Sequence, residues 1–372
     1  MGVTSGAQFC RNGGWPNARV NTNNEMTDEL ERGDFLIDPS EPTTPPREPA
    51  EKPFTAADFT PERMLRHRSV PPSSGPRRAL YRLTGGLVNL GPSPAEVRER
   101  ELIARVKAPV DDCRRIVVIS RKGGVGKTTT TLMLGHTFST YRGDRVIALD
   151  GNPDAGSLAY RVRRETSATV TDLLRDMPGI DRYADIRSYT SQSPTRLEVI
   201  ASDDNPRISQ ALGESDYKAL VDLLDKHYNL ILLDTGTGIL HSATRGILEL
   251  ADQVLLVTRP SLDGARASSL TLDWLDEHGY QDLVKGSVTV INALQDPGIV
   301  ELERVEEHFS VRCRAVVRIP WDPRLEAGAE TGLEELRPAT RQAYLDLAAA
   351  VADGFGATWW AAPRRSPGDV SH

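Results

Sequence analysis

Residues 116–134 read IVVISRKGGVGKTTTTLML, and this stretch decides the fold. The apolar run Ile116–Ile119 is continuous rather than alternating, as expected of a strand that is buried on both faces. A glycine-rich loop follows, and Thr128–Tyr141 then reads as a helix. A strand, a glycine-rich loop and a helix that opens with Lys127 and Thr128 form the context of a phosphate-binding loop. The sequence therefore predicts a site for a nucleoside triphosphate, with ATP and Mg²⁺ as the expected ligands.

Each residue type of this loop serves phosphate binding. Glycines let the backbone approach the phosphates, and the amino terminus of the following helix adds its positive dipole end. Lys127 supplies a charge for the β- and γ-phosphates, and the Thr128 hydroxyl is placed to ligate Mg²⁺. The predicted nucleotide-binding residues of the loop are Gly123, Gly124, Val125, Gly126, Lys127, Thr128 and Thr129.

Short apolar runs alternate with amphipathic helical patterns along the rest of the domain. The other runs are Arg145–Leu149, Leu197–Ile200, Leu230–Leu233, Val254–Val257, Val288–Ile291 and Ala315–Ile319. The helices predicted between and after them are Tyr217–His227, Gly264–His278 and Ala339–Ala352. This order predicts an α/β fold with a doubly wound, mostly parallel sheet, in which ligands bind beyond the carboxyl ends of the strands.

Acidic and amide side chains follow two of these runs at that edge of the sheet. Asp150 ends the second run, and Asn152 and Asp154 follow it closely. A carboxylate there can hold a Mg²⁺-bound water or orient the attacking water. Asp234 ends a later run in the position of a Walker B acid, which reaches Mg²⁺ through water. We therefore predict Thr128 and Asp234 as the metal-binding residues.

The loop departs from the standard pattern at its first position, where that pattern has a glycine six residues before its lysine. Arg121 stands there, and a second lysine, Lys122, follows it. The run KGGVGKTT resembles the deviant Walker A motif of the MinD/ParA ATPases, over roughly residues 114–355. The resemblance implies a P-loop NTPase that forms a homodimer on ATP binding, in which Lys122 reaches the phosphates of the partner.

The same resemblance assigns roles to other strand-end residues. The group usually shows Asp-x-Asp-Pro after the second strand, and its second Asp positions the attacking water. Asn152 holds that place here, so hydrolysis is expected to be slow unless Asp154 takes over. Asn292 and Pro320 correspond to the residues of the group that contact adenine. The resemblance thus implies catalytic roles for Lys122, Lys127, Asp150, Asn152 and Asp154.

Further stretches point to a narrower resemblance. They are DRVIALDGNPD at 144–154, GTGILHSA at 236–243, SLDGAR at 261–266 and LTGGLVNLG at 83–91. With the proline-rich front, they make the chain similar to the EspI-type ATPases associated with type VII (ESX) secretion in actinobacteria. This resemblance implies an accessory or regulator of secretion, with secretion components as partners of the amino-terminal arm.

The amino-terminal part differs in composition from the rest. Thirteen of the 25 prolines lie before residue 96, and the charge changes from acidic to basic along this part. Such a composition predicts a disordered arm that can serve in interactions. The predicted organisation is a proline-rich arm over 1–92, a helical linker over 93–113, a P-loop ATPase domain over 114–355 and a flexible tail over 356–372.

The overall composition narrows the setting. Three dispersed cysteines match neither a disulfide framework nor a metal site, which indicates a reducing compartment. No secretory signal and no apolar stretch of membrane-spanning length is present in the sequence. We therefore expect a cytoplasmic protein without stable membrane insertion.

Two other functions stay open. A partitioning ATPase that binds DNA non-specifically needs a basic face. The basic segment Arg63–Arg82 favours it, whereas the last predicted helix has Arg341 as its only cation. The other is a nucleotide-binding regulator that never hydrolyses ATP, which the amide at Asn152 favours.

Overall fold

The computed structural model describes residues 71–73, 75–152, 156–203, 205–238, 242–294 and 301–356. The chain divides into two compact units, Met1–Arg68 and Ser69–His372, and all described residues belong to the second unit. The predicted arm up to residue 70 and the predicted tail from residue 357 lie outside the described residues. For those two segments the interpretation stays a prediction.

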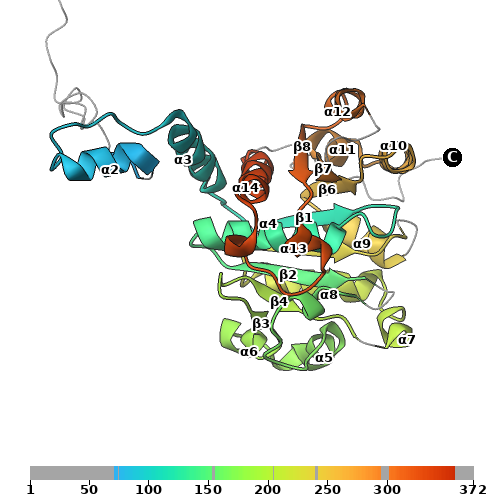
Figure 1. The fold of residues 1–372 in the computed structure, drawn as a ribbon. Helices are drawn as coiled ribbons and strands as arrows, with labels where there is room; N and C mark the ends of the chain where they lie inside the picture. The colour runs from blue at the N-terminus through green and yellow to red at the C-terminus, as the bar shows by residue number, and fades with distance from the viewer. Residues whose placement is uncertain are drawn as a thin grey trace, which may run out of the picture. The chain divides into compact units, whose positions relative to one another are not determined.

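An eight-stranded sheet forms the centre of the described unit (Figure 1). Its strands are β1 (Arg114–Ile119), β2 (Val146–Gly151), β3 (Ser191–Gln192), β4 (Glu198–Ile200), β5 (Leu230–Thr235), β6 (Gln253–Thr258), β7 (Val288–Leu294) and β8 (Ala315–Pro320). Their order is β3-β4-β2-β5-β1-β6-β7-β8, and every pair is parallel except β3 with β4. The predicted mostly parallel α/β sheet is confirmed.

Successive side chains of each strand enter two different cores. In β1, Ile116 and Val118 belong to one hydrophobic cluster, and Val117 and Ile119 belong to the other. Because helices cover both faces, strands of this kind carry continuous apolar runs. The first cluster includes α3 (Pro94–Val106), α4 (Lys127–Tyr141) and α14 (Pro338–Ala352). The second includes α5 (Val170–Asp176), α6 (Tyr183–Arg187), α8 (Glu214–Asp225), α9 (Ser242–Leu250), α10 (Leu262–Glu277), α11 (Gln281–Gly286) and α12 (Leu302–Ser310).

Helix α3 begins where the sequence predicts. The Ser93 hydroxyl accepts the N–H of Glu96 at 3.2 Å, and the Glu96 carboxylate accepts the N–H of Ser93 at 2.9 Å. This reciprocal capping box, with Pro94 in the first helical position, satisfies two backbone donors of the helix start. Glu96 also accepts the N–H and the hydroxyl of Ser73, at 3.0 and 2.7 Å, so it ties the preceding chain to the helix.

Helix α2 (Gly75–Leu83) differs from the prediction of a disordered arm that extends to residue 92. Prolines are dense before this helix, but none occurs between Pro76 and Pro92. Pro76 itself lies in the first turn, where a proline is tolerated because its missing N–H has no helical partner. The prediction therefore failed here because it treated the whole proline-rich part as uniform.

Short elements were also missed by the sequence patterns. They are η2 (Ala159–Arg161), η3 (Met177–Gly179), α7 (Pro206–Ser209), α13 (Pro323–Glu326) and η4 (Leu333–Glu335), besides the two-residue strand β3. Elements of two to four residues are too short to show a helical or alternating period. Within the described part of the chain, no helix is both long and apolar enough to cross a bilayer.

Candidate nucleotide-binding site

The glycine-rich loop joins β1 to α4 at the carboxyl edge of the sheet. Gly124 and Gly126 take φ values of 71° and 95°, which L side chains rarely adopt. Among the described residues, no acceptor takes the backbone N–H groups of residues 123–127. Together with the open first turn of α4, these donors form a cradle that suits an anion.

Asn292 supports the loop from β7. Its Nδ2 donates a hydrogen bond to the carbonyl oxygen of Val125 at 2.8 Å, and its side chain is 7% exposed. A Cβ on Gly126 would lie 2.1 Å from this nitrogen, so the close approach requires a glycine. The amide that we predicted to contact the base therefore also fixes the shape of the phosphate loop. Pro320 ends the neighbouring strand β8, and its contact with a base stays a prediction.

Lys127 is half-buried at the start of α4. Burial lowers the pKa of its ammonium group, and the nearby Asp234 carboxylate opposes that shift. A charge that is partly removed from water gains from an anionic partner. The lysine is thus set to receive a phosphate.

Asp234 and Thr128 meet as the sequence predicts. Asp234 is paired with Val118 of the neighbouring strand β1, so the end of β5 lies beside the loop. The Thr128 hydroxyl donates to Asp234 Oδ2 at 2.6 Å, and the Thr131 hydroxyl donates to Oδ1 at 3.4 Å. The carboxylate is 2% exposed, and burial raises its pKa, although the Thr128 hydroxyl and Lys127 oppose this.

These oxygens fit Mg²⁺. A hydroxyl and a carboxylate are hard oxygen ligands, and Mg²⁺ is usually held by one or two protein groups together with substrate phosphates. Among the described residues, no cluster of three or more acidic, His or Cys side chains could hold a metal alone. The donor set therefore suits a cation that arrives with phosphates.

Asp150 lies beside Asp234, because the two residues are register partners on β2 and β5. Burial raises the pKa of Asp150, and the Asp234 carboxylate raises it further. Its two carboxylate oxygens accept the N–H groups of Asn152 at 3.2 Å and Leu158 at 3.0 Å. A Cβ on Gly156 would lie 1.8 Å from the same carboxylate. Asp150 thus organises the segment after β2, a role that the sequence did not predict.

The structure does not bring the other predicted catalytic residues together into one cluster. Asn152 is half-buried directly after β2, and Asp154 lies outside the described residues. Lys122 is exposed, and its Nζ lies 3.3 Å from a carboxylate oxygen of Asp263 at the start of α10. An exposed ion pair of this kind contributes only about 0–1 kcal/mol. The lysine is therefore easily released toward another anion.

Sequence reasoning missed Arg161 at the end of η2. Its Nη1 donates to the Thr129 hydroxyl at 2.6 Å, in the first turn of α4. No motif marks it, because the chain between β2 and α5 is irregular. Only the folded structure brings this cation to the loop.

Comparisons with known proteins agree with this fold. A family profile described as an AAA domain matches residues 113–281. The ParA family ATPase from Chlorobium tepidum has a TM-score of 0.55 at 19% identity, over 63% of this chain and 98% of that one. The septum site-determining protein MinD from Pyrococcus horikoshii, solved with Mg-ADP, has a TM-score of 0.52 at 21% identity, over 63% of this chain and 94% of that one. The fold is thus of the class that the ParA and MinD structures share.

Within that class, the sequence resembles the ESX-1 secretion-associated protein EspI of Mycobacterium tuberculosis. The two are 40% identical over 272 residues, which is 72% of this chain and 40% of EspI. This chain therefore matches well under half of its relative's length. The predicted resemblance to the EspI-type ATPases is confirmed.

Proposed function

We propose that the chain is an ATP-dependent switch that binds Mg-ATP on the loop of residues 122–129 and hydrolyses it slowly. The observation that carries this proposal is the hydrogen bond of 2.6 Å between Thr128 and Asp234. Beside it lie the half-buried Lys127 and backbone donors that find no acceptor among the described residues. A hydroxyl, an acid, an ammonium group and backbone N–H groups are the parts that a P-loop uses on phosphates.

In this proposal different protein groups bind different parts of the ligand. Thr128 and Asp234 would hold Mg²⁺, which when bound neutralises charge on the phosphates. Lys127 binds the β- and γ-phosphates, and the amino terminus of α4 adds its partial positive charge. Asn292 favours adenine over guanine, so a competition titration with ATP and GTP checks the base. Tighter binding of GTP would remove this assignment.

The proposed switch forms a homodimer on ATP binding, and this homodimer depends on Lys122. The side chain of this lysine is 45% exposed, and its ion pair with Asp263 is itself exposed, so the lysine is available to a second copy of the chain. The test is the molar mass by light scattering in a non-hydrolysable ATP analogue with Mg²⁺. Lys122→Ala should stay monomeric, whereas Asp263→Ala, which removes the same ion pair from the other side, should still dimerise. Dimers of Lys122→Ala would refute the role of the lysine.

Slow hydrolysis follows from Asn152. An amide can hold a water but cannot accept its proton, so the step lacks a base unless Asp154 supplies it. We expect Asn152→Asp to raise single-turnover phosphate release by about tenfold or more, on the scale of general-base catalysis. Release that stays unmeasurable in both proteins would instead favour a regulator that never hydrolyses ATP.

The biological role that we propose is an accessory or regulator of type VII secretion in the cytoplasm. The similarity to EspI supports it, and it extends only to the part of EspI that this chain matches. DNA partitioning has less support from the described residues, because two acidic residues at the last helix pair with arginines of α3. They are Asp346 of α14, which pairs with Arg98, and Asp353 directly after α14, which pairs with Arg105. A gel shift with DNA at rising salt, with and without ATP, tests it. Salt-sensitive binding would favour partitioning.

A further inference from the structure

Arg161 stands at the phosphate-binding end of α4. It closes η2, in the segment that follows β2, and its Nη1 donates to Thr129 Oγ1 at 2.6 Å. Thr129 is the third residue of α4. The first-turn N–H groups of a helix have no acceptor within the helix and point toward an incoming ligand. A guanidinium therefore lies beside the turn that we assign to phosphate binding.

This guanidinium has no counter-ion in the described structure. Arg161 is half-buried, and among the described residues no carboxylate lies within 4.0 Å of it. Two other arginines differ: the half-buried Arg115 pairs with Asp252 at 2.9 Å, and the buried Arg142 pairs with Asp144. Removing a charge from water without a partner is costly, so the fold leaves Arg161 ready for an anion.

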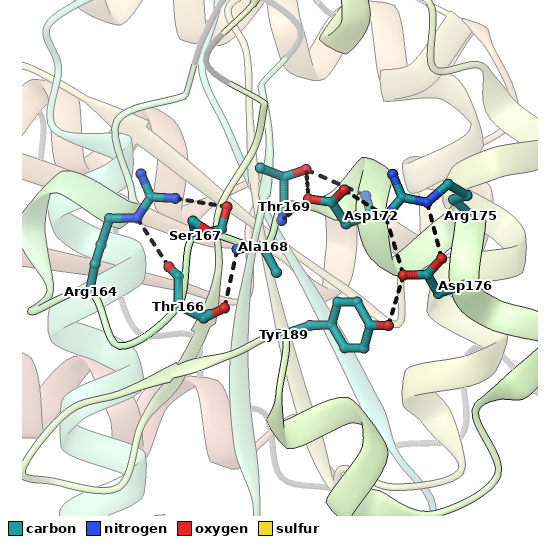
Figure 2. A network of polar contacts seen from close by, with 9 residues as sticks. All are labelled: Arg164, Thr166, Ser167, Ala168, Thr169, Asp172, Arg175, Asp176 and Tyr189. Carbon is teal, nitrogen blue, oxygen red and sulfur yellow. Dashed lines mark hydrogen bonds and ion pairs between the residues drawn. The ribbon is translucent and has the colours of Figure 1, made fainter.

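The segment that carries Arg161 is held on both sides. Before it, the N–H of Leu158 donates to Asp150 at 3.0 Å. After it, Figure 2 shows Arg164 on the carbonyl oxygens of Thr166 and Ser167, ahead of the cap of α5. These anchors fix the backbone around η2, so the arginine is presented from a defined position.

Neighbouring groups also limit where the guanidinium can go. A Cβ on Gly328, in the loop after α13, would lie 3.5 Å from Arg161 Nη2. Its Nη1 is held by Thr129 in the first turn of α4. The guanidinium thus lies between the loop after α13 and the first turn of α4. An anion bound at that turn is close to the guanidinium.

We propose that Arg161 is a nucleotide-binding residue whose guanidinium contacts the phosphate that lies against Thr129. This inference rests on the proposed function. Because Lys127 binds the β- and γ-phosphates and Thr128 would hold the Mg²⁺ beside them, the phosphate at Thr129 is the α-phosphate. The planar fork of an arginine matches two phosphate oxygens at once. Arg161 therefore supports the binding of nucleoside diphosphates and triphosphates alike.

The experiment is a calorimetric titration of the full chain with ADP and with a non-hydrolysable ATP analogue, both with Mg²⁺. Arg161→Gln keeps a donor for the Thr129 hydroxyl but removes the charge, whereas Arg161→Lys keeps the charge. We expect the Gln variant to bind both nucleotides about tenfold or more weakly, as for the loss of a charge-assisted hydrogen bond. The Lys variant should retain most of the affinity. Arg163→Gln, at an exposed arginine two residues away, should stay within about twofold.

Each other outcome overturns a defined part of the reasoning. If the Gln variant binds as the wild type does, or retains affinity that the Lys variant loses, Arg161 is only a support for Thr129. If the ATP analogue alone is weakened, the contact is with the γ-phosphate and the placement is wrong. If the wild type binds neither nucleotide, the proposed function itself fails. The thermal midpoint without nucleotide, measured for each variant, excludes misfolding as the cause.

Discussion

Replacing Asp234 by Asn should stabilise the nucleotide-free protein and weaken its binding of Mg²⁺-nucleotide. Asp234 is 2% exposed, and burial raises the pKa of its carboxyl group despite the Thr128 hydroxyl and Lys127. A raised pKa means that the ionised form costs more free energy in the folded chain than in the unfolded one. Asn removes the charge and keeps an oxygen that can accept the Thr128 hydroxyl. The variant should therefore gain free energy of unfolding and lose affinity for Mg²⁺-nucleotide, two changes of opposite sign.

The magnitude follows from the balance of burial and partners. Replacing a buried ion pair by apolar residues of similar volume is often neutral or stabilises a protein by about 1–4 kcal/mol. Because Lys127 and Arg161 lose an attractive neighbour, we expect the lower half of that range, about 1–2 kcal/mol, at neutral pH. The gain is fully present above the folded pKa of the carboxyl group. It shrinks as the pH falls and vanishes below the unfolded pKa, because the wild-type group is then neutral in both states.

Two assays check both signs. Urea unfolding in EDTA at pH 7 and near pH 3.5 measures the free energy of unfolding of wild type and variant. Calorimetric titration with ADP, in Mg²⁺ and in EDTA, measures affinity. We expect a loss of about tenfold or more in Mg²⁺, or about 1.4 kcal/mol, and no loss in EDTA. A variant that is less stable at pH 7, or that loses equal affinity in EDTA, would refute the assignment of Asp234 to the metal.

Two further predictions concern the glycine and the amide that shape the site. Gly156→Ala should lower the free energy of unfolding by about 2–4 kcal/mol, because its Cβ would displace the Asp150 carboxylate. The control Gly143→Ala should change it by under about 0.5 kcal/mol, because nothing lies within 4 Å of the new Cβ. Equal effects in denaturant unfolding would contradict this. Asn292→Leu should cost about 1–3 kcal/mol, because the Val125 carbonyl loses its buried donor, and should weaken ADP binding. Unchanged ADP affinity would show that the loop keeps its shape without Asn292.

All strands of the sheet except β3 could be predicted, because strands buried on both faces have continuous apolar sequences. The run before Asp234 also placed this acid beside Thr128, since parallel strands end at one edge. The start of α3 matches the start of the helical linker predicted over 93–113, and its capping box is an equally local feature. Features that depend on a local sequence pattern could therefore be predicted.

The rest depends on contacts that the sequence does not encode locally. Asp150 bonds to N–H groups of its own downstream segment, and Arg161 reaches Thr129 from an irregular stretch. Asn292 holds a carbonyl of the loop across 167 residues of chain. The contacts of Arg161 and Asn292 arise from tertiary packing, and those of Asp150 arise from an irregular segment, so no periodicity could have indicated them.

The most direct test of the account is a calorimetric titration of the wild type and Lys127→Ala with Mg-ATP. Lys218→Ala is the matched control, because Lys218 is an exposed lysine on α8. The account predicts that the wild type and the Lys218→Ala variant bind one ATP per chain, and that Lys127→Ala binds at least about tenfold more weakly. Equal affinity of Lys127→Ala and wild type, or no binding by any of the three, would contradict the assignment of this loop as the nucleotide site.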